Sequence, residues 1–296
     1  MKKLILVLSG ALLCHLLSAQ ENAIPTTAMS FCAIDNMPAS IALGGQYLGN
    51  NLNTKLFSEK KCDINISWQN WQPKTIKSNH IYGNASYRFG KRFNIGLDFL
   101  SRTQTAYDIL DENGNTKGQY TPSELNVGAG LSFLIINNLA ANINVHYISS
   151  KLSSEALLST FYADLLLTWN TKYLSITAGA VNIGPSIKRK SDKSYPLPSA
   201  ATIQGIYNIP FGLSLYLNTN YYFIGGLGAS IGAQYGLNDM LFVRAGYHLG
   251  TGAAPIPSFA SIGLGAKFFG VHIDLSYLTA SEALGNTLAI GLGYSF

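Results

Sequence analysis

From about residue 62 to the C-terminus, apolar and polar residues alternate with a period of two. The run at 138–149 illustrates it, with one face formed by Leu139, Ala141, Ile143, Val145 and Tyr147 and the other by Ala140, Asn142, Asn144 and His146. A strand places successive side chains on opposite faces of a sheet. About 14 such runs have the length of a tilted membrane-crossing strand. They cover residues 62–70, 79–89, 92–103, 123–134, 138–149, 158–169, 172–182, 199–208, 211–222, 227–236, 240–249, 258–268, 270–278 and 287–296.

The connections between these runs alternate between short and long. The short ones are 90–91, 135–137, 170–171, 209–210, 237–239 and 269–270. The long ones are 71–78, 104–122, 150–157, 183–198, 250–257 and 279–286, and only 223–226 breaks the contrast. Outer-membrane barrels have short periplasmic turns and long outer loops, and an even strand number places both termini at the turns.

The sequence therefore predicts an all-β fold, a transmembrane antiparallel β-barrel of about 14 strands. The apolar face is expected to meet lipid, because the other face carries Asn, Ser, Gln, Arg and Asp side chains. A closed barrel satisfies every backbone hydrogen-bonding group inside a bilayer. Aromatic residues near the strand ends are expected to form the two interfacial girdles. These are Trp68, Trp71, Tyr87, Phe89, Phe99, Trp169, Tyr221, Tyr222, Tyr247, Phe268, Tyr277 and Tyr294.

The first 61 residues do not follow this pattern. Residues 1–19 predict a secretory signal peptide, because Lys2 and Lys3 precede an apolar stretch that ends in Leu17-Ser18-Ala19. Residues 20–61 alternate poorly and predict a periplasmic or plug-like N-terminal segment. The barrel is then expected to span 62–296.

The composition supports a membrane barrel more than a soluble enzyme. Charged residues make up 12% of the chain, against about 25% in soluble domains. The net charge of +5 is too small to predict nucleic-acid binding. The sequence shows no motif for a metal or cofactor, and we expect none. After signal cleavage two cysteines remain, Cys32 and Cys62, and the sequence leaves open whether they form a disulfide.

Charged and histidine side chains on the polar face predict a lumen network. They are Arg88, Asp98, His146, Asp164, Arg244, His248, Lys267, His272 and Asp274. Mutual pairing would explain them, and contact with a substrate is the alternative. His272 and Asp274 share a face, a geometry that some outer-membrane hydrolases use, but no partner can be placed beside them, so we expect no enzyme. Inward glycines are expected to leave room inside, namely Gly128, Gly130, Gly228, Gly232, Gly263, Gly265, Gly291 and Gly293.

Several loop residues are candidates for docking a partner. The loop 183–198 is basic, whereas 68–73 and 250–257 are apolar and rich in Gly or Pro. A basic loop can attract lipid phosphates or an acidic protein, and exposed apolar loops can mark a docking surface. Solvated loops or a lipid-embedded rim are the alternatives. The candidates are Trp68, Trp71, Pro73, Lys188, Arg189, Lys190, Pro255 and Pro257.

Short motifs in the chain resemble the PorV/PorQ family of outer-membrane proteins, relatives of FadL-type transporters. The motifs are P-A-S-I-A-L-G-G at 38–45, D-I-N-I-S-W-Q-N-W at 63–71, D-E-N-G-N-T-K-G-Q-Y-T-P-S-E at 111–124 with the strand start at 125–130, F-Y-A-D at 161–164, V-N-I-G at 181–184, L-P at 197–198 and L-G-N-T at 284–287. Two features depart from the family. Ser40 stands where the family has arginine, and the N-P-A element expected after Gly45 is missing.

The resemblance implies a role in the type IX secretion system of Bacteroidetes. Such barrels bind secreted client proteins by a C-terminal signal domain, or dock the surface attachment complex, without bond chemistry. The expected partners are therefore outer-membrane lipid, secreted proteins and other secretion-system subunits. A FadL-like channel for hydrophobic small molecules stays open as the alternative, and an enzyme is kept only for the inward His and Asp side chains.

Overall fold

A computed structural model describes residues 27–45, 52–72, 77–154, 156–188, 194–279 and 285–296. The predicted signal peptide at 1–19 lies outside the described residues. Within them, no helix is both long and apolar enough to cross a membrane.

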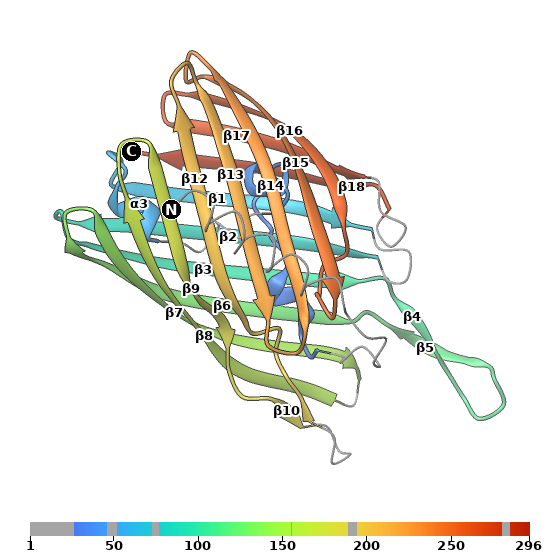
Figure 1. The fold of residues 1–296 in the computed structure, drawn as a ribbon. Coiled ribbons are helices and arrows are strands. Elements are labelled where there is room, and N and C mark those ends of the chain that lie inside the picture. Colours follow the sequence, from blue (N-terminus) through green and yellow to red (C-terminus); the bar gives the residue numbers. More distant parts are fainter. Residues whose placement is uncertain (1–26, 46–51, 73–76, 155, 189–193, 280–284) are drawn as a thin grey trace.

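Fourteen antiparallel strands close into one barrel, in which each strand pairs with its neighbours and β1 pairs with β18 (Figure 1). The strands of the barrel are β1 (Cys62–Trp71), β2 (Ser78–Phe89), β3 (Phe93–Gln104), β6 (Ser123–Ile136), β7 (Leu139–Ser153), β8 (Ala156–Asn170), β9 (Leu174–Ile183), β12 (Ala200–Ile209), β13 (Leu213–Tyr222), β14 (Gly226–Leu237), β15 (Leu241–Gly252), β16 (Phe259–Phe268), β17 (Val271–Thr279) and β18 (Thr287–Ser295). The predicted fold class, strand number and order are confirmed.

The connections differ from the prediction at the loop end, the end of the barrel opposite the short turns. The predicted loop 150–157 is mostly strand, because β7 continues to Ser153 and β8 begins at Ala156. Two other loops contain hairpins, β4 (Tyr107–Leu110) with β5 (Thr116–Tyr120) and β10 (Ile187–Lys188) with β11 (Ser194–Tyr195). The β4–β5 hairpin projects beyond the barrel (Figure 1). We call the opposite end, which carries the short turns and the C-terminus, the turn end.

The two faces of the wall have the predicted polarity. On β7, Ile143 and Val145 are 45% and 52% exposed on the outer face, whereas Asn142 and Asn144 are almost fully buried inside. The same alternation of exposed apolar and buried polar residues recurs around the ring. An apolar outer face of this kind is stable against lipid and unstable against water.

Two of the predicted girdle aromatics face the lumen. Trp71 and Tyr222 are 6% and 3% exposed, because Trp71 has the parity of the inward Asn65 and Gln69, and Tyr222 that of Asn220. Tyr277 is partly buried. The other nine are exposed, as a girdle requires: Trp68, Tyr87, Phe89, Phe99, Trp169, Tyr221, Tyr247, Phe268 and Tyr294.

Short N-terminal elements lie inside the ring of strands (Figure 1). They are η1 (Ser30–Ala33), α2 (Pro38–Ile41) and α3 (Asn53–Leu56). The α2 helix contacts β16, β17 and β18, whereas α3 contacts β2, β3, β6, β7 and β8. The described part of the N-terminal segment is therefore a plug that touches two different parts of the wall, on either side of β1.

The inward glycines make room for this plug. Leu43 covers Gly232 and Gly246, Ala42 lies on Gly263, and Pro38 lies on Gly291. A Cβ at Gly246 would lie 2.2 Å from the carbonyl carbon of Leu43. The expectation that the inward glycines leave room inside is thus corrected. Plug residues fill the space at Gly232, Gly263 and Gly291, and wall side chains fill it at Gly128, Gly228, Gly265 and Gly293.

Substituting Gly246→Ala should loosen the plug. The added methyl meets the Leu43 backbone, and overpacking of this kind costs about 1–3 kcal/mol. Limited proteolysis of the folded barrel should then cut within 27–45 at least about fivefold faster. Gly205→Ala is the matched control, because no described atom lies within 4 Å of the added Cβ. Equal cleavage of the two variants would contradict the packing of Leu43 against Gly246.

Candidate functional site: the plugged lumen

The L-G-G element of the plug is clamped between three wall strands. Ser230 Oγ of β14 donates to the Gly44 carbonyl at 2.8 Å, and the Gly44 N–H donates to Ser261 Oγ of β16 at 3.2 Å. Ser230 also bonds His248 Nδ1 at 2.9 Å, and the His248 ring stacks on Phe259. Gly44 has φ of +89°, which favours glycine. His248, predicted as a lumen residue, therefore supports the plug.

A second group of bonds holds the start of the plug. Asn36 meets His80 Nδ1 through its side chain at 2.9 Å, and its carbonyl accepts from Ser67 Oγ at 2.6 Å. Ser40, which replaces the arginine of the resembled family, donates through its hydroxyl to the Asp35 carboxylate. The hydroxyl group of Ser40 therefore finds its hydrogen-bond partner within the plug itself.

The loop half of the lumen contains an apolar core. Phe31, Ile34 and Ile41 of the plug pack there against wall residues that include Tyr82 and Leu100. Loop residues complete the cluster, namely Ile187, Leu197 and Ile256. Barrel interiors are ordinarily polar, so this apolar region needs a specific explanation.

His146 lies between two carboxylates near the middle of the wall. Its Nδ1 is 3.6 Å from Asp98 Oδ1 of β3, and its Nε2 is 3.5 Å from Asp164 Oδ2 of β8. The His146 ring also stacks on Tyr162 with centroids 4.5 Å apart. Gly128 lies between Asp98 and His146 in the register, and a Cβ there would be 2.3 Å from Nδ1. The glycine thus allows the carboxylate and the imidazole to meet across one strand.

The sequence prediction missed a neighbouring ion pair on the same face. Arg102 Nη1 and Glu124 Oε2 lie 2.6 Å apart on directly paired positions of β3 and β6. Ser150 Oγ also donates to Glu124 at 2.9 Å. The alternation along β6 could have revealed Glu124, because it lies two residues before the inward Asn126 and so shares its face.

The wall contains a bulge where β9 passes Asp164. Ala163 pairs with Ile183 and Leu165 with Ala180, so Val181 and Asn182 together oppose the one residue Asp164. Asn182 has φ of +56°, and its N–H donates to Asp164 Oδ1 at 2.8 Å.

The bulge brings three of the resemblance motifs together. Asn182 Nδ2 donates to the Pro198 carbonyl at 3.2 Å, and Ser199 Oγ donates to the Asn182 carbonyl at 2.5 Å. The F-Y-A-D, V-N-I-G and L-P elements, which are separate in the sequence, therefore form a single hydrogen-bonded cluster with Asn182 at its centre.

The other predicted lumen residues lie nearer the turn end and form no continuous network with this cluster. Arg244 Nη1 pairs with Asp274 Oδ1 at 2.5 Å. His272 Nε2 meets Asn65 Oδ1 at 2.6 Å. Arg88 donates to backbone carbonyls of the plug, including Glu59 at 3.1 Å. Within the described part of the chain, these lumen side chains form several separate groups.

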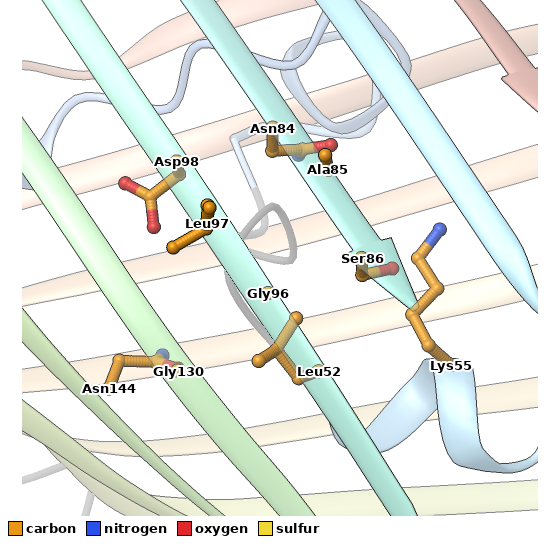
Figure 2. A pocket seen from close by; sticks show the side chains of 10 residues that line it. All are labelled: Leu52, Lys55, Asn84, Ala85, Ser86, Gly96, Leu97, Asp98, Gly130 and Asn144. Atoms are coloured by element: carbon orange, nitrogen blue, oxygen red, sulfur yellow. The ribbon is translucent and has the colours of Figure 1, made fainter. Parts of the chain in front are cut away.

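Figure 2 shows a small cavity between the plug and strands β2, β3, β6 and β7, with Asp98 on β3 and Asn144 on β7. Its volume of about 20 Å³ is enough for about one water molecule. Leu52 fills most of the space over Gly96 and Gly130. The described residues around this cavity therefore leave no wide passage.

The candidate docking residues are only partly available at the surface. Trp68 is 40% exposed on the outer face of β1, within a strand and not a loop. Trp71 is buried and stacked on His80, so it cannot meet a partner. Lys188 is exposed, and Pro255 and Pro257 are half-buried. Pro73, Arg189 and Lys190 lie outside the described residues.

The two cysteines are free. Cys32 belongs to the apolar core of the loop half, whereas Cys62 begins β1 at the turn end. Burial raises the pKa of the Cys32 thiol, which therefore stays protonated.

No family model and no curated protein matches the sequence. Solved structures do share the fold. The toluene transporter TbuX of Ralstonia pickettii is 13% identical with a TM-score of 0.66, and the match covers 90% of this chain and 100% of that one. The monoaromatic hydrocarbon channel CymD is 12% identical with a TM-score of 0.61, over 89% and 98% of the two chains. The toluene transporter TodX of Pseudomonas putida is 12% identical with a TM-score of 0.57, and the match covers 89% of this chain and 98% of that one.

The chain has the barrel fold of these transporters and channels. The predicted location in the outer membrane is confirmed by this fold. The neighbours that share it are transporters and channels, and identities of 12% and 13% transfer the architecture alone.

Substituting Asp164→Ala should destabilise the barrel, because it removes the acceptor of the buried Asn182 N–H and one carboxylate beside His146. A buried donor without its acceptor costs about 1–3 kcal/mol. Urea unfolding in lipid vesicles, followed by tryptophan fluorescence, measures the loss. Asp108→Ala on the exposed hairpin, where the carboxylate accepts from Gln119, is the control and should change stability by less than about 0.5 kcal/mol. Equal losses would argue against a structural role for the bulge cluster.

Proposed function

We propose that this barrel is a plugged outer-membrane channel that admits hydrophobic small molecules at its loop end. The observation that carries the proposal is the apolar core inside the loop half of the lumen, where a polar surface is the usual finding. The solved structures named as toluene and monoaromatic hydrocarbon transporters support it through their shared fold.

A small cavity at the edge of this core, which Asp35, Gln69 and His248 also line, supports the proposed entry position. Ile34 and Ile41 of the plug line it together with Trp71, Phe259 and Leu278 of the wall. Its volume of about 10 Å³ is too small for a benzene-sized ligand. Binding therefore requires the plug residues to move, and the ligand then replaces their apolar contacts with the wall.

Vesicles that contain the purified barrel should take up labelled toluene or a labelled fatty acid faster than empty vesicles. Leu278→Asn places an amide in the apolar core and should slow uptake at least about tenfold. Leu110→Asn is the matched control, because Leu110 is 58% exposed on the β4–β5 hairpin. Heat-modifiable mobility on gels verifies that both variants fold. Uptake no faster than in empty vesicles would overturn the proposal.

A second candidate function is the client-binding role in the type IX secretion system. The cluster formed by the F-Y-A-D, V-N-I-G and L-P elements favours it, because these motifs carry the resemblance to the PorV/PorQ family. The projecting β4–β5 hairpin gives such a barrel an outer surface for a protein partner. Its two tyrosines are fixed, since Tyr107 Oη donates to the Leu152 carbonyl and Tyr120 Oη to that of Lys151.

If this second function is correct, the purified barrel should retain secreted proteins that carry a C-terminal signal domain. Replacing 107–120 by a short Gly-Ser linker should reduce retention and leave toluene uptake unchanged, so the two functions are separable. Deletion of the gene should then lower the amount of surface-anchored protein. Normal surface anchoring in the deletion strain would exclude this role.

A further inference from the structure

A cavity of about 300 Å³ opens at the turn end of the barrel. It lies between plug residues after α3 and the wall strands β14 to β18, at the end opposite the apolar core. Short turns face the periplasm in barrels of this kind. Its volume lies at the lower end of the range for small-molecule sites, about 300–1,000 Å³.

The charges around this cavity are unbalanced. Four permanent cations line it, Lys55, Lys60, Arg244 and Lys267, against two carboxylates. Both carboxylates are already engaged, Asp63 with Lys55 at 2.8 Å and Asp274 with Arg244 at 2.5 Å. Among the described residues, no ion pair involves Lys60 or Lys267. Two positive charges therefore remain for a ligand.

Arg244 is held in place before any ligand arrives. It is 7% exposed, its Nε donates to Gln234 Oε1 at 2.7 Å, and its guanidinium lies over the Phe242 ring. Together with the bond to Asp274, these contacts use two of its five N–H donors. A buried arginine with spare donors at a cavity wall suits the oxygens of an anion.

A glycine makes this arrangement possible. Gly265 pairs with Asp274 in the β16–β17 register, and a Cβ there would lie 2.6 Å from both Arg244 Nη1 and Asp274 Oδ1. On the same pair of strands, Lys267 is directly opposite His272. His272 is itself oriented by Asn65, so Arg244 and His272 are both fixed while Lys267 supplies charge beside them.

We propose that this cavity binds a small oxyanion, the phosphate or carboxylate group of a metabolite or lipid headgroup, on the periplasmic side of the barrel. Arg244 supplies hydrogen-bond donors, and Lys60 and Lys267 supply the unmatched charge. The site is separate from the loop-side core, so the proposal stands whether or not hydrophobic molecules cross the barrel.

The test is a titration of the purified, folded full-length barrel in detergent with inorganic phosphate, at constant ionic strength made up with chloride. Saturable heat by calorimetry is expected. Lys267→Gln and Lys60→Gln should each weaken affinity about fivefold or more, since each removes a charged contact. Lys117→Gln on the exposed hairpin is the matched control and should bind as the wild type does. No saturable binding, or equal weakening in the control, would overturn the site.

A second variant tests the geometry without removing charge. Gly265→Ala should displace the Arg244–Asp274 pair and weaken phosphate binding, whereas Gly205→Ala should not, because its Cβ meets no described atom within 4 Å. Unchanged affinity in Gly265→Ala would contradict the role given to Arg244. Comparing the affinities for glycerol 3-phosphate and lysophosphatidic acid distinguishes a soluble metabolite from a lipid headgroup as the natural ligand. Equal affinity indicates a soluble metabolite, and tighter binding of the lipid indicates a headgroup.

Discussion

The space inside a closed ring of strands limits everything else in this molecule. Neighbouring strands lie about 4.8 Å apart, so side chains two strands apart can touch only when the residue between them is very small. Gly128 satisfies this between Asp98 and His146, and Gly293 does so between His272 and Asn65. Other inward glycines accept the plug backbone directly, as Gly246 accepts Leu43. Glycine thus decides both where the plug lies and which polar groups meet.

The same constraint explains what the sequence could and could not predict. Alternating polarity depends only on local spacing and on lipid outside, so it placed the strands to within a few residues. It did not show that the plug fills the lumen, because contacts such as Ser230 with Gly44 join residues far apart in the chain. Alternation alone therefore predicts free space at the inward glycines, where the structure places plug residues and wall side chains. The alternation along β1 and β13 places Trp71 and Tyr222 on the inward face, so the sequence pattern was sufficient to predict both rings inside.

The lumen is divided along its axis. The loop half contains an apolar core shared by plug and wall, beside buried polar groups such as Arg102 and Glu124, whereas the turn half is polar, with Asn53, Asn94 and Asp63 among its buried side chains. The Asp98–His146–Asp164 group lies between them. Apolar and anionic groups are thus expected to bind at opposite ends of the barrel.

Different interactions attach the two described parts of the plug to the barrel wall, so the free-energy cost of displacing each part differs. Residues 52–60 are attached mainly by polar contacts, such as Lys55 to Asp63 and Asn53 to Thr168. Such bonds contribute about 0.5–1.5 kcal/mol each, because water can replace them. Residues 27–45 bury Phe31, Ile34 and Ile41, and exposing one such side chain costs about 1.5–3 kcal/mol. An apolar ligand in the loop half offsets that cost by taking over the contacts. Water entering from the turn end makes no such contacts, so the proposed channel function predicts that the loop half of the plug opens to apolar molecules.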